Sequence, residues 1–274
     1  MDHMPQTGQS GFDLYIGEVG QQRFYGTTRF MPGTTELNCE LFRNTVRKRR
    51  NFIVNFPLYN GVEAFQLGLD SGSTLEAPPP YRQDRPVVVY GTSITQGGCA
   101  SRPGACYTNI LSRTLNRPFI NLGFSGNGRG EPEMARLVAE IADPAMLILD
   151  YEGNCVNAET FSRTLPEFVR ILREVHPAVP LLILSKIRFG AEALDVEPND
   201  YNLSIRYRES CRDIQLRLVE ERRRQGDLHI HFMDGANLLG NDYTECTVDG
   251  VHPTDMGFYR MAAGIAPEIE RLLD

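Results

Sequence analysis

Two parts of the chain differ in the spacing of their apolar residues. Between residue 11 and about residue 69, short runs rich in aromatic and β-branched residues are separated by Gly, Pro and Asn, at intervals typical of antiparallel hairpins. The runs read FDLYI, RFYGTTRF, TELNCELF, NFIVNFPLY and VEAFQLGL. This pattern predicts an N-terminal region built from β-strands.

After Pro86 the pattern changes to short, wholly apolar runs that alternate with longer segments of helical period. Unbroken apolar strands are typical of a sheet that is covered on both faces, and the segments between them carry apolar residues three and four apart. The alternation predicts a doubly wound parallel sheet with right-handed crossovers. The five expected strands are residues 86–90, 118–122, 145–151, 180–185 and 229–234.

A proline-rich segment separates the two patterns. Three successive prolines at residues 78–80 can continue neither a β-ladder nor a helix, so the segment is expected to be a stiff linker. We expect a β-rich accessory domain at residues 1–74, a linker at 75–85 and an α/β domain at 86–274. The length of 274 residues also suits a single large domain.

Composition and charge exclude several classes of protein. No apolar run is long enough to span a bilayer, so no transmembrane segment is expected. The formal net charge of −7 argues against a protein that mainly binds nucleic acid. A basic tetrad at residues 47–50 is either a patch for polyanions or a solvated turn, and the turn is favoured.

The six cysteines are scattered and form no CxxC pair, which excludes zinc ribbons and thioredoxin-type redox sites. Cys99 and Cys106 are close enough in sequence to bridge a loop, but a chain of this size does not need a disulfide. The pairing of the cysteines and the oligomeric state therefore stay open.

Polar segments follow several of the predicted strands. In doubly wound sheets, ligands bind outside the carboxyl ends of the strands, near the point where the strand order reverses. We therefore expect these segments to meet at one edge of the sheet. They are residues 91–95 (GTSIT), 123–128 (GFSGNG), 152–155 (EGNC) and 249–253 (DGVHP).

One of these segments places Ser93 at a strand-to-helix turn, where its hydroxyl is raised clear of the sheet. A serine hydroxyl needs an imidazole within hydrogen-bonding reach to act as a nucleophile. His252 lies in a strand-end loop, and Asp249 is three residues before it, close enough to orient the ring. We therefore predict Ser93 as nucleophile, His252 as general base and Asp249 as its partner. The histidines that lack such a partner in the sequence are His3, His176, His229 and His231.

An oxyanion must also be stabilised in such a reaction. The candidate donors are the backbone amides of Ser93 and Gly126 and the side-chain amide of Asn154. Each residue also has an ordinary structural explanation as a helix cap or a turn. The combination favours catalysis, because four separate segments supply the required residue types at the same edge.

These segments resemble the four blocks of the SGNH, or GDSL-like, hydrolase superfamily of esterases and lipases. The resemblance covers residues 86–274 and assigns Ser93 as nucleophile and oxyanion donor, Gly126 and Asn154 as further donors, and Asp249 and His252 as the acid–base pair. It implies a flavodoxin-like three-layer α/β/α sandwich with a five-stranded parallel sheet. Two departures stand out, because Thr92 and Cys155 occupy positions where aspartate is common in the family.

Residues 11–15 (GFDLY) are similar to the Gly-x-Asp-Leu-Tyr signature of a subgroup with an N-terminal β-domain. This implies that a smaller all-β sandwich, truncated at its start, precedes the hydrolase domain. In that subgroup the β-domain begins well before the signature, so a signal peptide is expected to be missing from this sequence. Secretion or a periplasmic location is therefore the hypothesis, with a cytoplasmic location as the alternative.

The resemblance implies two-step hydrolysis of a small O-acyl ester, such as an acetyl ester of a carbohydrate, without a metal or an organic cofactor. The expected partner is therefore a small-molecule or carbohydrate ester. One alternative is a carbohydrate-binding protein with a degenerate hydrolase domain, which the departures at Thr92 and Cys155 would fit. Another is a nucleotide or flavin binder that uses the glycines of residues 123–130, although these lack the spacing of the known phosphate-binding motifs.

Overall fold

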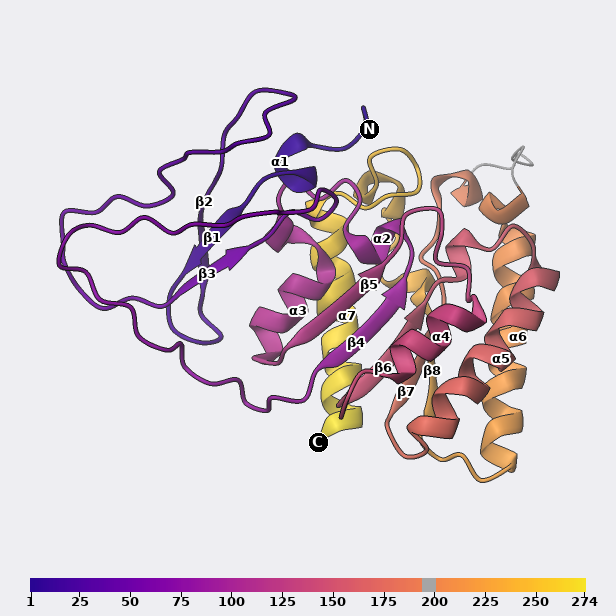
Figure 1. The fold of residues 1–274 in the computed structure, drawn as a ribbon. Helices are drawn as coiled ribbons and strands as arrows, with labels where there is room; N and C mark the ends of the chain where they lie inside the picture. Colours follow the sequence, from indigo (N-terminus) through magenta and orange to yellow (C-terminus); the bar gives the residue numbers. More distant parts are fainter. Residues whose placement is uncertain (194–200) are drawn as a thin grey trace.

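The larger part of the protein is built on a parallel five-stranded sheet in the order β5-β4-β6-β7-β8 (Figure 1). The structure is a computed structural model that describes residues 1–193 and 201–274. Each of the five predicted apolar runs supplies one strand, so this prediction is confirmed. The strands are β4 (Val87–Gly91), β5 (Phe119–Gly123), β6 (Met146–Asp150), β7 (Leu181–Leu184) and β8 (Ile230–Met233).

Helices cover both faces of this sheet. Alternate residues of β4 point to opposite sides: Val87 and Val89 pack in the core that includes α3 and α7, whereas Val88 and Tyr90 pack in the core that includes α4, α5 and α6. The predicted three-layer α/β/α arrangement is therefore confirmed. The helices are α3 (Tyr107–Leu115), α4 (Pro132–Ala139), α5 (Ala158–Val175), α6 (Ile205–Arg224) and α7 (Asp255–Leu273).

Short helical turns carry most of the connections at the carboxyl ends of the strands. Three of them directly follow β4, β6 and β8 and fix the backbone at these strand ends. The α-helical turns are α1 (Gln6–Gln9) and α2 (Ser93–Gln96). The 3₁₀ turns are η1 (Pro103–Ala105), η2 (Glu152–Asn154), η3 (Gly190–Ala193), η4 (Tyr201–Leu203), η5 (Gly235–Asn237) and η6 (Tyr243–Cys246).

The strand order reverses beside β4. The chain passes from β4 outward to β5 and then returns to β6 on the other side of β4, which is the flavodoxin-like order. The register pairs Gly91 at the end of β4 with Gly123 of β5 and with Asp150 of β6. Three strands therefore end level with one another at the switch point, and the segments that follow them lie close together.

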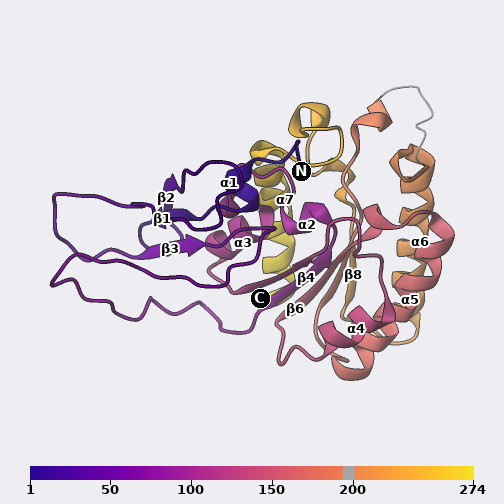
Figure 2. The same ribbon diagram turned by 45° about the horizontal axis from the view of Figure 1, so that its top comes forward.

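The N-terminal region contains an antiparallel sheet of three strands, in the order β2-β1-β3. It lies beside α3 (Figure 1, Figure 2). Its strands are β1 (Asp13–Ile16), β2 (Arg23–Thr27) and β3 (Phe52–Asn55). The expected β-rich region is thus confirmed as a single sheet, whereas a second sheet that would complete a sandwich is not found in the described residues.

The prediction of strands is wrong for two of the five apolar runs in the N-terminal region. Residues 35–42 and 62–69 form no ladder, and apolar side chains such as Leu67 and Leu69 are half exposed. A sandwich needs a second apolar face to cover such residues, and the described residues supply none. These segments therefore form extended loops instead.

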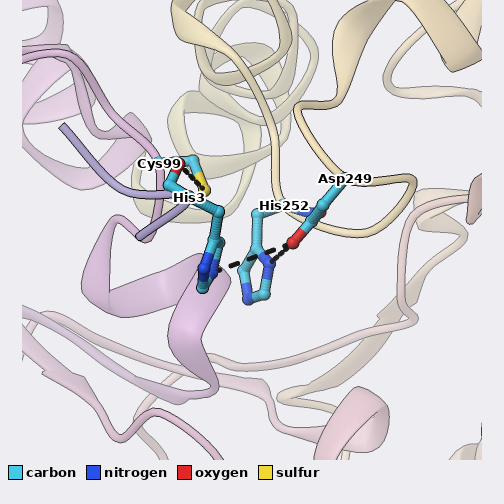
Figure 3. A group of neighbouring side chains, drawn as sticks. All are labelled: His3, Cys99, Asp249 and His252. Carbon is cyan, nitrogen blue, oxygen red and sulfur yellow. Dashed lines mark hydrogen bonds and ion pairs between the residues drawn. The ribbon is translucent and has the colours of Figure 1, made fainter. Parts of the chain in front are cut away.

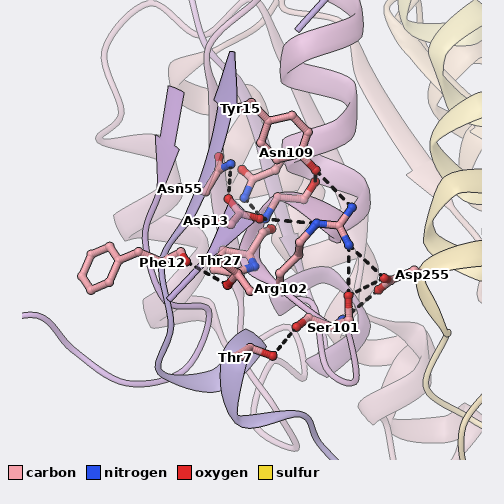
Figure 4. Close-up of polar contacts among 12 residues, drawn as sticks. Thr7, Phe12, Asp13, Tyr15, Thr27, Asn55, Ser101, Arg102, Asn109 and Asp255 are labelled. Atoms are coloured by element: carbon pink, nitrogen blue, oxygen red, sulfur yellow. Dashed lines mark hydrogen bonds and ion pairs between the residues drawn. The ribbon is translucent and has the colours of Figure 1, made fainter. Parts of the chain in front are cut away.

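The sheet docks through the predicted GFDLY motif (Figure 4). Asp13 is fully buried, and its carboxylate accepts hydrogen bonds from the Gly104 amide at 2.7 Å and from Asn55 Nδ2 at 2.7 Å. The Tyr15 hydroxyl donates to the Gly104 carbonyl at 3.2 Å, and the Arg113 guanidinium lies 3.8 Å from the centre of its ring. The motif thus joins the N-terminal sheet to η1 and α3.

Two features left open by the sequence are also visible. All six cysteines lie in the described residues and are free thiols, and Cys99 and Cys106 are both buried. Among the helices of residues 1–193 and 201–274, none combines the length and the hydrophobicity that a membrane span requires.

Candidate active site

Ser93 is the first residue of α2 and follows β4 at the switch point of the sheet. The Thr92 side chain caps this helix, because its hydroxyl oxygen accepts from the Ile94 amide at 3.1 Å. The Ser93 amide lies in the first turn, where no acceptor is available within the helix. The threonine that departs from the family pattern therefore has a structural role in presenting Ser93.

The three predicted catalytic residues are brought together by the structure. Ser93 Oγ lies 2.8 Å from His252 Nε2, and His252 Nδ1 lies 2.7 Å from Asp249 Oδ2. The two links form one chain from carboxylate to imidazole to hydroxyl. Figure 3 shows the Asp249 carboxylate directed at the His252 ring.

The turn before His252 is held by the same aspartate. Asp249 Oδ1 accepts from the amides of Val251 at 3.0 Å and His252 at 2.7 Å. Gly250 adopts a left-handed conformation with φ of +84°, which a residue with a side chain rarely adopts. The DGVH spacing thus folds the chain back so that Asp249 faces the imidazole of a residue only three positions away.

The charge on Asp249 is favoured in this position. Partial burial acts to raise its pKa, but the hydrogen bonds from the His252 amide and imidazole outweigh burial and lower the pKa below the usual value. An ionised carboxylate can only accept hydrogen bonds, so His252 Nδ1 carries the proton. Nε2 is then free to accept from the Ser93 hydroxyl.

The candidate oxyanion donors lie on neighbouring loops. Asn154 lines the same pocket as Ser93, and one N–H of its side chain donates to the Phe124 carbonyl at 3.0 Å, which leaves the second N–H available. Gly126 lies in the loop after β5 with φ of +69°, and its amide finds no acceptor in the described residues. Gly126 does not line that pocket, although the bond from Asn154 to Phe124 connects the two loops.

The glycine that ends β5 and a glycine in the loop after it serve close packing. A Cβ on Gly123 would lie 2.1 Å from the Gln96 amide nitrogen, and one on Gly128 would lie 2.3 Å from the Gly91 carbonyl oxygen. Both distances are too short for a side chain, so these glycines let the loop pack against β4 and α2. This explains them without a bound phosphate and argues against the nucleotide-binding alternative.

A small cavity of about 30 Å³ opens beside Ser93. Phe189 and Ile187 belong to its wall and come from the segment that follows β7. No sequence motif indicated these two residues, although the strand-end rule points to their segment as well. The remaining apolar wall is formed by Ile94, Leu184, Leu238, Val251 and Met261.

Asp150 is a buried carboxylic acid that also lines this cavity. Its Oδ2 accepts from the Tyr107 hydroxyl at 2.9 Å and from Thr95 Oγ1 at 3.0 Å. Burial dominates over these hydrogen bonds and raises the pKa of Asp150 to about 7. The residue connects the end of β6 to α2 and α3, and no sequence motif indicated it.

Glu152 is the second buried acid at the end of β6. Its Oε2 accepts from the Lys186 amide at 3.0 Å and from Gln215 Nε2 at 3.0 Å. Burial raises its pKa to about 7, against the opposing effect of the Lys186 charge. These contacts tie the segment that carries Asn154 to β7 and α6.

Cys155, the second departure from the family pattern, is completely buried. Burial raises the pKa of its thiol to about 12, so the residue is neutral and unreactive. It packs in the core on the α4, α5 and α6 side of the sheet. A neutral side chain suits this position, and the departure does not alter the residues around Ser93.

Two residues that the sequence analysis left aside lie next to the triad. His3, which has no partner nearby in the sequence, has its Nε2 3.9 Å from Asp249 Oδ2, and its ring centre is 5.5 Å from that of His252. Cys99 is buried below them, and its Sγ donates to the His3 carbonyl at 3.6 Å. Contacts over such long separations in sequence leave no local signal.

The fold and this arrangement of residues define an SGNH, or GDSL-like, hydrolase. A sequence model of the GDSL-like lipase/acylhydrolase family matches residues 84–270, and a model of the N-terminus of SGNH_hydro-type esterases, which is named for its GxDLY motif, matches residues 1–75. The chain belongs to the GDSL-like lipase/acylhydrolase family. A comparison with curated proteins gave no match.

Solved structures agree with this assignment. A GDSL-like lipase from Bacteroides ovatus is 31% identical, with a TM-score of 0.88 over 100% of this chain and 77% of that chain. The salicylyl-acyltransferase SsfX3 from a tetracycline biosynthetic pathway is 19% identical, with a TM-score of 0.70 over 98% of this chain and 75% of its own. A family two carbohydrate esterase from Clostridium thermocellum, in complex with cellohexaose, is 17% identical, with a TM-score of 0.68 over 98% of this chain and 87% of that chain. The last two share the fold.

Proposed function

We propose that the protein is a serine esterase that hydrolyses small O-acyl esters through an acyl-enzyme on Ser93. The observation that carries this proposal is the continuous chain of contacts from Asp249 to His252 at 2.7 Å and from His252 to Ser93 at 2.8 Å. A serine held in this way can transfer its proton to the imidazole as it attacks a carbonyl carbon.

The proposed reaction has two steps. In the first, Ser93 Oγ bonds to the ester carbonyl carbon while His252 Nε2 takes the hydroxyl proton; the intermediate then collapses, and His252 returns that proton to the departing alcohol. In the second, a water molecule gives a proton to His252 and attacks the acyl carbon; the acyl–Oγ bond then breaks, His252 returns that proton to Ser93 Oγ, and the carboxylic acid is released. The amides of Ser93, Gly126 and Asn154 would donate to the oxyanion in both steps.

The size of the cavity supports a short acyl group. A water molecule needs about 10–15 Å³ of such space, so a cavity of about 30 Å³ has room for a group of acetyl size. The apolar wall, which includes Phe189 and Ile187, suits a methyl group better than a charged one. We therefore infer that acetyl esters are preferred over longer acyl chains.

A carbohydrate is the favoured alcohol part of the substrate. A structure with the same fold over 98% of this chain is a carbohydrate esterase in complex with cellohexaose. The site lies at the open carboxyl edge of the sheet, where Asp249 and Asn154 are both exposed enough to meet a polar substrate. Acetylated sugars are therefore the first compounds to test.

The test compares the wild-type protein with Ser93→Ala and with the control Ser73→Ala, which changes an exposed serine in the loop before the linker. We expect hydrolysis of p-nitrophenyl acetate and acetylated sugars, labelling by a fluorophosphonate probe, and loss of both in Ser93→Ala alone. Turnover that persists in Ser93→Ala would refute the proposal. Absence of labelling together with sugar binding would favour the alternative of a carbohydrate-binding protein.

A further inference from the structure

Four side chains of the types that bind metal ions converge beside the triad. His3, Cys99, Asp249 and His252 each offer one ligand atom, and these atoms all lie within 4.8 Å of one another (Figure 3). They come from three segments that are far apart in the sequence: the N-terminal segment, the loop after α2 and the loop before α7. No local sequence spacing accounts for this convergence.

Asp249 Oδ2 is close to both imidazoles. It is 2.7 Å from His252 Nδ1 and 3.9 Å from His3 Nε2. In a tetrahedral zinc site, bonds of about 2.0–2.3 Å place the ligand atoms roughly 3.3–3.8 Å apart. The longest separation therefore exceeds that of a formed site by about 1 Å, whereas the 2.7 Å between His252 Nδ1 and Asp249 Oδ2 is shorter than in such a site. Zinc binding thus requires the partly exposed His3 side chain to move inward and the other two atoms to move apart.

The N-terminal segment holds His3 at this position. Met4, the next residue, is buried, and its carbonyl accepts from Gln9 Nε2 at 2.8 Å. Thr7 Oγ1 donates to the Ser101 carbonyl at 2.5 Å, which ties the segment to the loop that carries Cys99. These contacts hold the backbone that follows His3, while the His3 side chain itself remains accessible from solvent.

We propose that His3, Cys99, Asp249 and His252 form a binding site for Zn²⁺ and that its occupation reversibly inhibits the enzyme. Two imidazoles, a thiolate and a carboxylate are typical ligands of zinc, whereas Mg²⁺ and Ca²⁺ prefer oxygen ligands throughout. Binding releases the proton of Cys99 Sγ to solvent and moves the proton of the neutral His252 imidazole from Nδ1 to Nε2, and the charge of the cation stabilises the thiolate.

Inhibition follows because two residues of the predicted triad, Asp249 and His252, become ligands of the metal. The bond from His252 Nδ1–H to Asp249 is replaced by two bonds to the metal, and the imidazole, bound through Nδ1, then carries its proton on Nε2. It can no longer take the Ser93 proton efficiently. This consequence rests on the proposed esterase function, whereas binding of the metal does not.

Zinc binding and inhibition should be measured separately on the full-length protein. We expect calorimetry to show one Zn²⁺ per chain and no binding of Mg²⁺, and Co²⁺ to give a thiolate charge-transfer absorption band. His3→Ala and Cys99→Ser should each weaken zinc binding and raise the inhibitory zinc concentration at least about tenfold relative to the basal turnover of the same variant. Cys99→Ser should also lose the cobalt band.

Matched controls use residues outside the cluster. His229→Ala and Cys39→Ser change an exposed histidine and the one cysteine that is not buried, and both should bind zinc and be inhibited as the wild type is. Equal inhibition in the wild type, His3→Ala and Cys99→Ser would overturn the proposal, as would a calorimetric titration without binding. If the esterase proposal alone fails, zinc still binds to the wild type and the cobalt band still depends on Cys99.

Discussion

Asp249 has two separate roles in its loop. Its Oδ1 holds the turn by accepting from the amides of Val251 and His252, and its Oδ2 holds the His252 imidazole. The structure thus separates the part of the residue that shapes the backbone from the part that orients the base. A substitution that preserves the first role can test the second.

Asp249→Asn is that substitution. Asparagine keeps an oxygen that can accept from the two amides, but it carries no charge to stabilise an imidazolium and does not fix the Nδ1–H tautomer. We expect kcat for p-nitrophenyl acetate to fall by about 10⁴-fold with little change in the circular dichroism spectrum. Asp213→Asn, on the exposed face of α6, is the control. Near wild-type turnover of Asp249→Asn would show that the carboxylate does not act through His252.

The raised pKa of Asp150 predicts that the stability of the protein depends on pH. Burial raises its pKa from the usual 3.8 to about 7, so the folded state binds a proton that the unfolded state releases in this interval. The stabilisation from the protonated acid is complete below the pKa that Asp150 has in the unfolded chain, and it is lost as the pH rises to about 7. Glu152, whose pKa is also raised to about 7, acts in the same direction.

Asp150→Asn should remove part of this dependence. The asparagine oxygen can still accept from Tyr107 and Thr95, but the side chain does not ionise. We expect the free energy of unfolding of the wild type to decrease between pH 5 and pH 7 by more than about 1 kcal/mol relative to the variant. Urea denaturation at both pH values measures this difference. Parallel curves for the two proteins would mean that Asp150 is ionised throughout.

The candidate site could be predicted from the sequence where its residues are close in sequence or directly follow a strand. Asp249 and His252 are three residues apart, and Ser93 and Asn154 each lie in a turn after an apolar run. His3 and Phe189 were not predicted, because their position depends on how distant segments pack. Sequence spacing carries no information on such contacts, whereas the topology of the sheet does.

At the scale of elements, the N-terminal sheet depends on its contact with the hydrolase layer. A sheet of three short strands needs a buried apolar face or packing against a helix to be stable. Here Tyr15 and Asp13 of β1 are buried against η1 and α3. Apolar alternation predicted strands throughout residues 11–69, but only those that find a ladder partner and a covered face are formed. The alternation cannot reveal which runs have such a partner.

Asp13→Ala tests this contact. The substitution leaves the buried Gly104 amide and the Asn55 side chain without their acceptor, which costs about 1–3 kcal/mol for the amide alone. We expect a decrease of this size in the free energy of unfolding, measured by urea denaturation. Asp70→Asn, at an exposed position of the same region, should leave it unchanged. A stability equal to that of the wild type would show that the carboxylate does not anchor the sheet.

The contact between the N-terminal sheet and η1 also reaches the loop of His252. Arg102 Nε lies 3.8 Å from Asp13 Oδ2, and Arg102 Nη1 donates to Asp255 Oδ2 at 3.2 Å (Figure 4). Asp255 begins α7, directly after the segment that carries His252, and accepts from the Ser101 amide at 2.8 Å. The N-terminal sheet is therefore linked to the candidate active site through an ion-pair network as well as through the chain.

At the scale of the whole molecule, we propose that residues 1–74 and 86–274 are two domains connected by the linker at 75–85. The linker is exposed along its length and forms neither helix nor strand. The two regions nevertheless contact each other closely, since the Gln96 side chain donates to the Leu58 carbonyl at 3.1 Å and Gly104 is bonded to Asp13 and Tyr15. Their association should therefore not require a continuous chain.

Cleavage of the chain between the two regions tests whether their interface alone holds them together. A protease recognition sequence inserted between Gly72 and Ser73, both exposed, allows the chain to be cleaved after folding. We expect the two fragments to elute together in gel filtration and to retain most of the turnover of the uncut protein, because the contacts around Asp13 and Gln96 remain. The same cut in the Asp13→Ala background should release the N-terminal fragment at a lower urea concentration. Fragments that separate without denaturant would show that the linker, and not the interface, holds the regions together.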